Sequence, residues 1–256
     1  MFAEERQQRI LTELTRLGRV EVLELVKTLE VSEDTVRRDL KALAVRGFLQ
    51  KTHGGAVSLD PSRMAYSARV DLYAEAKTSI GERAAELVQA GQSVILDAGS
   101  TVLELARRLR VRPLVVLTNS LDIASVFAAD AGVKLSLTGG EWDVSSRYLV
   151  GASTVASLSQ RRADWAFLGA CAFHPSAGIT SVSDADAAVK RAMLEAADKT
   201  VVLADASKAE QIAPFLVCPL ERLHALVTDD ENVARTLEQR GVRVLLAADT
   251  DLRGEM

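Results

Sequence analysis

The stretch 31–55, VSEDTVRRDLKALAVRGFLQKTHGG, constrains the fold of this chain more than any other segment. Its second residue is Ser32, whose side chain is suited to cap the first turn of a helix. We expect this helix to run to about Val45 and to end at Gly47, because glycine readily adopts the conformation that terminates a helix. Residues 48–57 then predict a β-hairpin. A helix followed by such a hairpin is typical of a winged helix-turn-helix, which places a helix in a DNA groove.

Two further helices are predicted before this segment, at residues 6–17 and 22–29. Both repeat apolar residues at helical spacing. In the third helix, an apolar stripe falls on one side and must pack against the first two helices. This stripe consists of Val36, Leu40 and Leu43.

The opposite side of the third helix carries residues that we expect to contact DNA. Arginine fits the O6 and N7 atoms of guanine, and threonine can bond a base edge or touch a thymine methyl group. Lysine or histidine in the hairpin can contact phosphates, which position a protein without reading sequence. The predicted DNA-binding residues are Ser32, Thr35, Arg37, Arg38, Lys41, Lys51 and His53.

Charge supports DNA binding only locally. The chain has a formal net charge of −4 and a pI of about 5.6, which disfavours indiscriminate binding to nucleic acid. Residues 1–58 contain ten Lys and Arg against nine Asp and Glu, but residues 37–51 contain one acid, Asp39, against five cations. One copy of so small a patch makes few phosphate contacts. We therefore expect a homo-oligomer, a dimer or larger, to bind double-stranded operator DNA.

From about residue 70, short apolar strands alternate with amphipathic helices, as in SVILD, TVLELARRL, LVVLTN and SLDIASVFAA. This alternation predicts an α/β fold, a mostly parallel sheet with helices on both faces. The preceding SLDPSRMAYS is polar and aperiodic, which is typical of a linker. With 256 residues, 48% of them hydrophobic, two domains are expected. They are a winged helix-turn-helix at 1–57 and, after a linker at 58–69, an α/β domain for effector binding and oligomerisation at 70–256.

Polar clusters follow directly on four of the apolar strands: DAGST, TNS, TGG and DASK. The carboxyl ends of parallel strands share one edge of a sheet, where ligands bind. Glycine permits close backbone approach, and hydroxyls with helix N–H groups suit an anion such as phosphate. Plain capped turns are the alternative. The clusters predict effector contacts from Asp97, Gly99, Ser100, Thr101, Asn119, Gly139, Gly140, Asp205 and Lys208.

Other classes of protein are disfavoured by what the chain contains. Its two cysteines have no metal-ligand spacing, so we expect neither a metal nor another cofactor. The N-terminus is too polar for a signal peptide, and no apolar run approaches the roughly 18 residues of a membrane span. We expect a cytoplasmic protein without membrane contact.

The VSEDTVRRDL core and the HGGAV exit, continued by LDAGST, LTNS, LTGG, FLGA, VKRAML and LADASK, closely resemble DeoR-type bacterial transcriptional regulators over essentially the whole chain. In that family the second domain is similar to a ribose-phosphate isomerase or glucosamine-phosphate deaminase and senses phosphorylated sugars. The resemblance implies a repressor of carbohydrate-metabolism genes that a phosphorylated sugar releases. It also adds Arg147 and Lys190 to the effector contacts.

Three departures from the family pattern lie near the expected pocket and leave the effector's identity open. Ala172 stands where the family often has glycine, Asp186 where it usually has glutamate, and Ala206 where it has serine. One alternative function is a sugar-phosphate isomerase or deaminase with a DNA-binding appendage. Such an enzyme needs a carboxylate base, and no acid-rich loop clearly supplies one. Another alternative is an architectural DNA binder without a ligand. We expect a regulator and not an enzyme.

Overall fold

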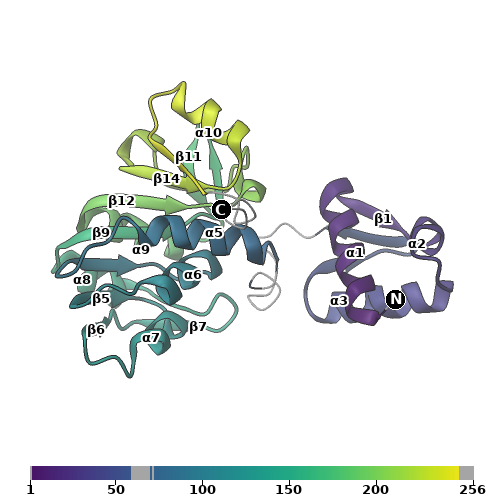
Figure 1. Ribbon diagram of the computed structural model, residues 1–256, viewed down its shortest axis with the longest axis horizontal. Coiled ribbons are helices and arrows are strands. Elements are labelled where there is room, and N and C mark those ends of the chain that lie inside the picture. The colour runs from purple at the N-terminus through teal and green to yellow at the C-terminus, as the bar shows by residue number, and fades with distance from the viewer. Residues whose placement is uncertain (1, 59–69, 71, 248–256) are drawn as a thin grey trace, which may run out of the picture. The chain divides into compact units, whose positions relative to one another are not determined.

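The computed structural model describes residues 2–58, 70 and 72–247 (Figure 1). Contacts divide the chain into two compact units, Met1–Leu72 and Tyr73–Met256. Buried apolar residues form one core cluster in the first unit and two in the second. Residues 59–69 of the predicted linker lie outside the described residues.

The first unit has the winged helix-turn-helix fold that the sequence predicts. Its three strands form an antiparallel sheet in the order β1-β3-β2. The sequence did not predict β1, whose pairing with β3 extends the wing from two strands to three. The elements in chain order are α1 (Ala3–Leu17), β1 (Arg19–Glu21), α2 (Val22–Leu29), α3 (Glu33–Val45), β2 (Leu49–Lys51) and β3 (Gly55–Ser58).

Local sequence signals explain how this unit forms. The Ser32 side chain accepts a hydrogen bond from the Thr35 backbone N–H at 3.3 Å and so begins α3 as predicted. The predicted stripe on α3 lies fully buried in the core. Gly55 allows β3 to approach β1, because a Cβ at this position would lie 1.9 Å from the carbonyl oxygen of Val20.

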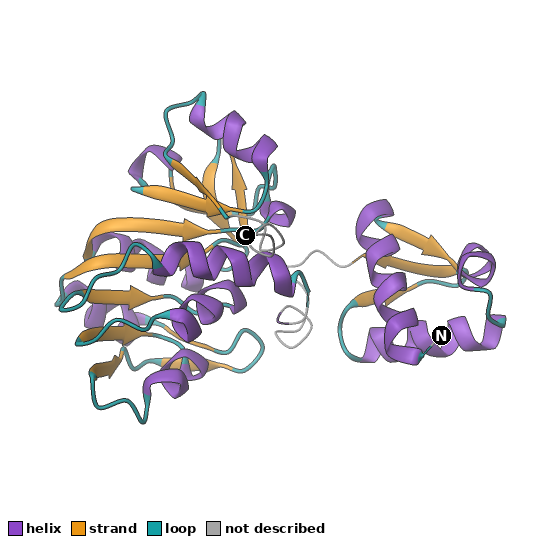
Figure 2. Cartoon of the chain, in the orientation of Figure 1, coloured by secondary structure: helices purple, strands orange, loops and turns teal. Residues whose placement is uncertain are grey.

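The second unit is built on a seven-stranded sheet in the order β15-β14-β12-β9-β4-β5-β6, in which every neighbouring pair is parallel (Figure 2). The predicted α/β class is thereby confirmed. The strands are β4 (Ser93–Leu96), β5 (Leu114–Thr118), β6 (Val133–Leu137), β9 (Ala163–Gly169), β12 (Ala197–Leu203), β14 (Ala225–Thr228) and β15 (Val244–Leu246).

Helices cover both faces of this sheet. Alternate strand residues point to opposite faces, so Val94 and Leu96 pack in one core cluster and Ile95 in the other. The first cluster includes residues of α5 (Ala74–Ala85), α6 (Ser100–Arg108) and α7 (Leu121–Phe127). The second includes residues of α8 (Ala152–Ser159), α9 (Asp184–Glu195) and α10 (Glu231–Glu238).

Two short antiparallel additions were not predicted. A hairpin of β7 (Glu141–Asp143) and β8 (Tyr148–Val150) follows β6. A separate sheet, β10-β11-β13, is made of β10 (Ala172–His174), β11 (Gly178–Ser181) and β13 (Phe215–Cys218). Both additions lie along the chain close to the predicted pocket loops, and the hairpin contacts one of those loops directly.

Candidate functional site

The predicted DNA-contacting residues lie on one exposed side of α3 and on the hairpin β2–β3. The hydroxyl oxygens of Ser32 and Thr35 lie 2.8 Å apart and share a hydrogen bond, which helps to fix the N-terminus of α3. The five basic side chains are exposed. These are Arg37, Arg38 and Lys41 on α3, and Lys51 and His53 on the hairpin.

The paired arginines of α3 have different environments. Arg37 donates two hydrogen bonds to the Glu33 carboxylate, at 2.9 and 2.6 Å, and both side chains are 48% exposed. No ion-pair partner of Arg38 lies among the residues that the structure describes. Arg38 is therefore available to a DNA base or phosphate without first leaving an intramolecular partner.

Asp39 does not oppose the cations on the exposed side of α3. It is 4% exposed and forms an ion pair with Arg6 of α1. Gln7 also donates a hydrogen bond to its carboxylate, at 3.2 Å. The hydrogen bond to Asp39 raises the pKa of Arg6 above its already high ordinary value. The single acid of residues 37–51 therefore joins α3 to α1 and does not offset the exposed cations of that stretch, although Glu33 and Asp34 remain exposed in the first turn of α3.

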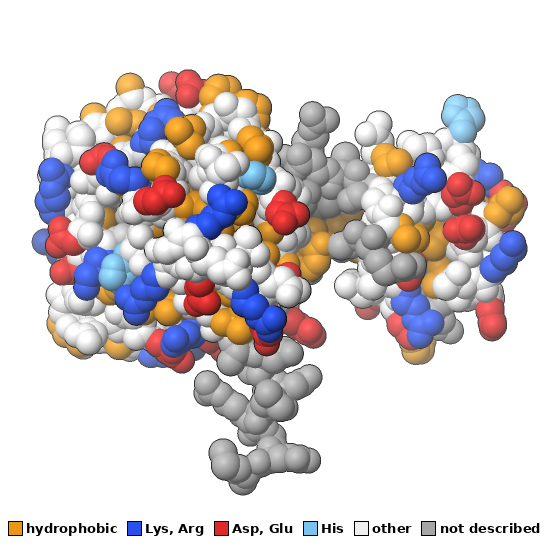
Figure 3. Space-filling view, turned by 90° about the horizontal axis from the view of Figure 1, so that it is seen from above, with side chains coloured by type: hydrophobic (Ala, Val, Ile, Leu, Met, Phe, Trp, Pro, Cys, Tyr) orange, Lys and Arg blue, Asp and Glu red, His pale blue; other side chains and the backbone are white. Residues whose placement is uncertain are grey.

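On the face shown in Figure 3, cationic and anionic side chains intermingle over the second unit. This distribution agrees with the formal net charge of −4. A duplex would thus be held at a local patch and not by the general field of the protein.

In the second unit, the four predicted polar loops follow β4, β5, β6 and β12. Because these strands are parallel in one sheet, the loops lie along the same edge. Strands β4, β5 and β6 are consecutive neighbours, while β9 separates β4 from β12. The first three loops therefore form a continuous group, and the loop after β12 lies two strands away from β4.

Asn119 joins two of the loops. Its side-chain oxygen accepts a hydrogen bond from the Ala98 backbone N–H at 3.0 Å, and its amide donates to the carbonyl of Leu149 at 3.3 Å. The Asn119 carbonyl in turn accepts from the Leu149 N–H at 2.8 Å. Asn119 is 1% exposed, so it holds the loops after β4 and β5 and the hairpin β7–β8 in position.

The glycines of these loops have conformations that other residues rarely adopt. Gly99 has φ 134° and is the N-cap residue of α6, so, among the described residues, the N-cap position itself supplies no side-chain cap to this helix. Gly139 and Gly140 have φ 72° and 118°. The half-buried Ser100 and Thr101 form the first turn of α6. A helix N-terminus with backbone N–H groups and hydroxyls is an arrangement that binds phosphate.

Lys190 lies in a buried cluster with two carboxylates. Its Nζ atom lies 2.7 Å from Asp97 Oδ2 and 2.8 Å from Asp186 Oδ1. Ser181 donates a 2.7 Å hydrogen bond to the other oxygen of Asp186, and the Gly169 N–H donates to Asp97 Oδ2 at 3.1 Å. The ammonium of Lys190 is thus neutralised within the protein and not directed at a ligand phosphate.

Burial affects the protonation of this cluster. Burial alone would lower the pKa of Lys190, but the carboxylates of Asp186 and Asp97 raise it well above its ordinary value. Burial raises the pKa of Asp97, and the ammonium of Lys190 opposes that rise. Lys190 is therefore charged, and the three groups together carry one excess negative charge when both carboxylates are ionised.

The remaining predicted effector contacts already have protein partners. Arg147 donates hydrogen bonds of 2.8 and 2.6 Å to Asp122 on α7 and lies over the ring of Trp142. Asp205 accepts a 3.1 Å hydrogen bond from the Ser207 N–H and so caps a short 3-10 helix, Ala206–Lys208. Lys208 is half-buried at the end of that helix.

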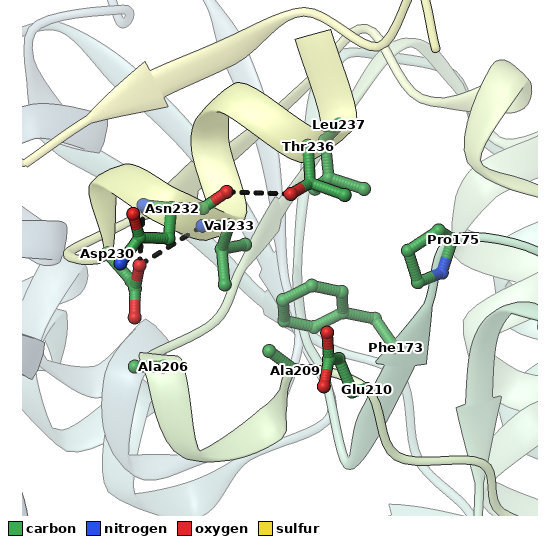
Figure 4. Close-up of a pocket in the computed structure, with 10 residues that line it drawn as sticks. All are labelled: Phe173, Pro175, Ala206, Ala209, Glu210, Asp230, Asn232, Val233, Thr236 and Leu237. Atoms are coloured by element: carbon green, nitrogen blue, oxygen red, sulfur yellow. Dashed lines mark hydrogen bonds between the residues drawn. The ribbon is translucent and has the colours of Figure 1, made fainter. Parts of the chain in front are cut away.

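A cavity of about 320 Å³ lies beside the loop after β12 (Figure 4). The figure shows Phe173 and Pro175 on one side and Val233 and Leu237 of α10 on the other. Its charged lining residues are both acidic, Glu210 and Asp230. None of the predicted effector contacts lines it, and its charge disfavours a phosphate.

The four carboxylates that could serve as the base of an enzyme are buried in ion pairs, cap a helical turn or lie on the surface. Asp97 and Asp186 are buried against Lys190. Asp205 caps a helical turn, and the side chain of Asp184 is 72% exposed at the start of α9. A base must reach a substrate proton within hydrogen-bond distance, so this arrangement does not favour isomerase or deaminase chemistry.

Within the described residues, His, Cys, Asp and Glu side chains form no group of three that could hold a metal ion. In the same part of the chain, every helix is too short or too polar to cross a membrane.

Family comparisons match both units. Residues 6–62 match the DeoR-like helix-turn-helix domain, and residues 73–230 match the DeoR C terminal sensor domain. The transcriptional repressor GlcR of Bacillus subtilis is 33% identical over 251 residues, which cover 96% of this chain and 97% of that protein. A putative aga operon transcriptional repressor of Escherichia coli O157:H7 is 30% identical, with coverage of 96% and 94%. An L-fucose operon activator of Haemophilus influenzae is 27% identical, with coverage of 94% and 99%.

Similarity to solved structures is weaker. Ribose 5-phosphate isomerase A from Methanocaldococcus jannaschii has a TM-score of 0.38 and 18% identity over 52% of this chain and 53% of that one. The translation initiation factor eIF-2B from Pyrococcus horikoshii has a TM-score of 0.47 and 17% identity, with coverage of 87% and 94%. These scores are too low to assign a ligand.

Proposed function

The chain belongs to the DeoR family of DNA-binding transcriptional regulators, and we propose that it represses carbohydrate-metabolism genes until a phosphorylated sugar releases it from operator DNA. Two of the relatives described above are named as repressors. The observation that most supports a ligand-controlled regulator is the group of glycine loops around the N-terminus of α6. This group lies in a unit separate from the winged helix.

The proposed DNA contacts are those of the exposed side of α3 and the wing. Arg37, Arg38 and Lys41 face outward from the helix, and Lys51 and His53 lie on the hairpin. Ser32 and Thr35 set the start of the reading helix. Since one copy offers few cations, we propose that a homo-oligomer binds the operator. Acting on a chromosome, such a regulator works in the bacterial cytoplasm.

The proposed effector contacts differ in the groups they offer. Gly99, Ser100 and Thr101 at α6 supply N–H groups and hydroxyls for a phosphate. Gly139 and Gly140 belong to the loop after β6, which lies at the same edge of the sheet as α6's N-terminus. Asn119, Lys190, Asp205, Lys208 and Arg147 hold or border these loops, and Asp97 lies directly before them.

The proposal is tested with operator DNA and a set of phosphorylated sugars. An operator is first selected from random duplexes with the full-length protein, and its affinity is then titrated in the presence of each compound. At least one sugar phosphate should weaken operator binding by about 5- to 150-fold, the usual range for coupled sites. The same compound should raise the temperature of thermal unfolding.

Three outcomes distinguish the parts of the proposal. If no sugar phosphate changes operator affinity or thermal stability, the effector assignment is wrong while DNA binding stands. If sequence-specific duplexes are not recovered, the DNA-binding assignment is wrong. A reporter gene behind the selected operator decides the sign of regulation. Deletion of the regulator should raise reporter expression if the protein is a repressor and lower it if the protein is an activator.

A further inference from the structure

One oxygen of the buried cluster around Lys190 has no hydrogen-bond partner. Asp97 Oδ2 accepts from Lys190 Nζ and from the Gly169 N–H, but Asp97 Oδ1 accepts from no described residue although its residue is 0% exposed. An unpaired carboxylate oxygen in the interior costs free energy, because it has lost its water and gained no donor. Unpaired buried polar atoms are few in folded proteins, and a donor supplied by a ligand is one explanation for such an oxygen.

The position of Asp97 connects this oxygen to the proposed phosphate site. Asp97 directly follows β4, and the chain then passes through Ala98 and Gly99 into the N-terminus of α6. A Cβ placed on Gly169 would lie 3.8 Å from both Asp97 Oδ2 and a methyl carbon of Val102, in the first turn of α6. The carboxylate and the start of α6 are therefore neighbours in space as well as in sequence.

The charges of the cluster decide what the missing partner is. Lys190 and the Gly169 N–H already donate to Asp97, and the cluster has one excess negative charge when its carboxylates are ionised. A second anion beside it would be repelled, so a phosphate does not belong there. A hydroxyl or an ammonium group can donate a hydrogen to Oδ1 and is attracted by the excess charge.

We propose that Asp97 Oδ1 accepts a hydrogen bond from a hydroxyl or amino group of the effector, while the effector's phosphate lies at the N-terminus of α6. This inference rests on the proposed function and specifies how the sugar phosphate is oriented. Lys190 then acts as a positioning residue that orients the Asp97 carboxylate. Because Oδ1 is closed to solvent in the structure, the proposed contact requires that the residues covering it move when the effector binds. The hydrogen bond to this oxygen then forms only in the conformation that binds the effector. Such a difference between two conformations is what allows a ligand to shift the equilibrium between them.

The experiment compares inorganic phosphate with a set of aldose and ketose phosphates and their deoxy and amino derivatives, using the full-length protein and calorimetry. For the wild type, at least one sugar phosphate should bind tenfold or more tightly than inorganic phosphate. Asp97→Asn should lower the affinity for that sugar phosphate by about 10- to 100-fold, the range for a hydrogen bond to a charged group. Binding of inorganic phosphate should change less than twofold.

Asp186→Asn is the matched control. It removes the other carboxylate of Lys190, but both oxygens of Asp186 are already bonded within the protein. We expect Asp186→Asn to lower the affinity for the sugar phosphate less than threefold. Equal effects of the two variants would overturn the proposal, because any disturbance of Lys190 would then suffice. Unchanged sugar-phosphate binding in Asp97→Asn would also overturn it, with the proposed function intact.

A second measurement needs no variant and covers the case in which Asp97→Asn does not fold. In the wild-type protein, removal of one particular hydroxyl from the sugar phosphate should lower affinity tenfold or more, and an amino group at that position should restore it. If every deoxy derivative binds within twofold of its parent, no donor reaches Asp97 and the inference is wrong. If no sugar phosphate binds better than inorganic phosphate, the proposed function itself fails.

Discussion

Arg37 and Arg38 are neighbours in sequence, but the structure gives them different freedom to bind DNA. Arg37 is held by Glu33 through two hydrogen bonds, and it must exchange this partner for a base or phosphate. Arg38 is exposed, and no described residue forms an ion pair with it. The residue in this pair that contributes most to specific binding should therefore be Arg38.

Arg38→Ala should weaken binding to the selected operator by about 1–3 kcal/mol and relax specificity at one base position, if Arg38 contacts a base. Lys51→Ala on the wing should weaken all duplexes alike and reduce the salt dependence, since a phosphate contact carries no sequence information. Fluorescence anisotropy with operator and scrambled duplexes separates the two effects. Operator binding that Arg38→Ala leaves untouched would show that a different side of α3 reads DNA.

Asp164 should make stability depend on acid pH. Ser93 donates hydrogen bonds to the Asp164 carboxylate from its hydroxyl at 2.6 Å and from its backbone N–H at 2.7 Å, and these bonds lower the pKa of Asp164 below its ordinary value. A carboxyl whose pKa is lowered by folding stabilises the protein above its unfolded pKa. That contribution is lost as the pH falls through the folded pKa.

Asp164→Asn should therefore destabilise the protein at pH 6, and its difference from the wild type should shrink as the pH is lowered from about 5 to below the unfolded carboxyl pKa of about 4. Urea unfolding at each pH measures this difference. Ser93→Ala is the companion variant, because it removes the hydroxyl donor and keeps the carboxylate. A difference between Asp164→Asn and the wild type that stays constant with pH would contradict the assigned origin of the shift.

At the level of elements, the loop after β6 depends on Gly140. A Cβ there would lie 2.1 Å from Thr154 Oγ1 and 2.5 Å from the Val150 carbonyl oxygen, and its φ of 118° is unfavourable for other residues. The loop thus fits between the N-terminal turns of α8 and the end of β8 only because position 140 has no side chain.

Gly140→Ala should destabilise the second unit by about 2–4 kcal/mol, since steric overlap adds to a backbone strain of about 1–3 kcal/mol. Gly139→Ala is the control. A Cβ at Gly139 meets nothing within 4 Å, so it should cost only the strain of its positive φ, about 1–2 kcal/mol. Thermal and urea unfolding of the wild type and the two variants measure these losses of stability. If both variants lose the same stability, the contact with Thr154 does not constrain this loop.

The sequence predicts the regular elements better than the short ones. The strands of the parallel sheet have continuous apolar runs because helices bury both faces, and such runs are visible without a structure. By contrast, β1, β7 and β10 have three residues each, too few for an alternating pattern to be recognised. Their positions depend on partners elsewhere in the chain.

The candidate site shows the same limit more clearly. The sequence places Asp97 after a strand and Lys190 on a helix, but their contact spans 93 positions and exists only because α9 packs against the sheet. The resemblance to the family predicts Lys190 as an effector contact, and in the structure two buried carboxylates surround its ammonium. No local pattern indicates the unpaired oxygen of Asp97, because hydrogen-bond satisfaction is a property of the folded chain.

At the scale of the whole molecule, a small charge excess has to suffice for holding DNA. The first 58 residues carry ten basic and nine acidic side chains. Asp39 is buried, but the exposed cations of α3 still form only a modest basic surface. The affinity of one copy for a duplex should consequently be low at physiological salt, because few counterions are released per copy. Two copies on adjacent half-sites would double the number of phosphate contacts.

The salt dependence of binding tests this expectation in full. For a duplex with two half-sites, the slope of log affinity against log salt concentration should be about twice that for a duplex with one, since the slope is about −0.9 for each phosphate contact. Sedimentation of the complexes should give two or more chains on the longer duplex. Lys51→Ala should reduce the slope by about 1 on the single half-site and by about 2 on the pair, because each copy loses one contact. Equal slopes on both duplexes, with one chain bound to each, would mean that a single winged helix holds DNA and that oligomerisation is not needed for binding.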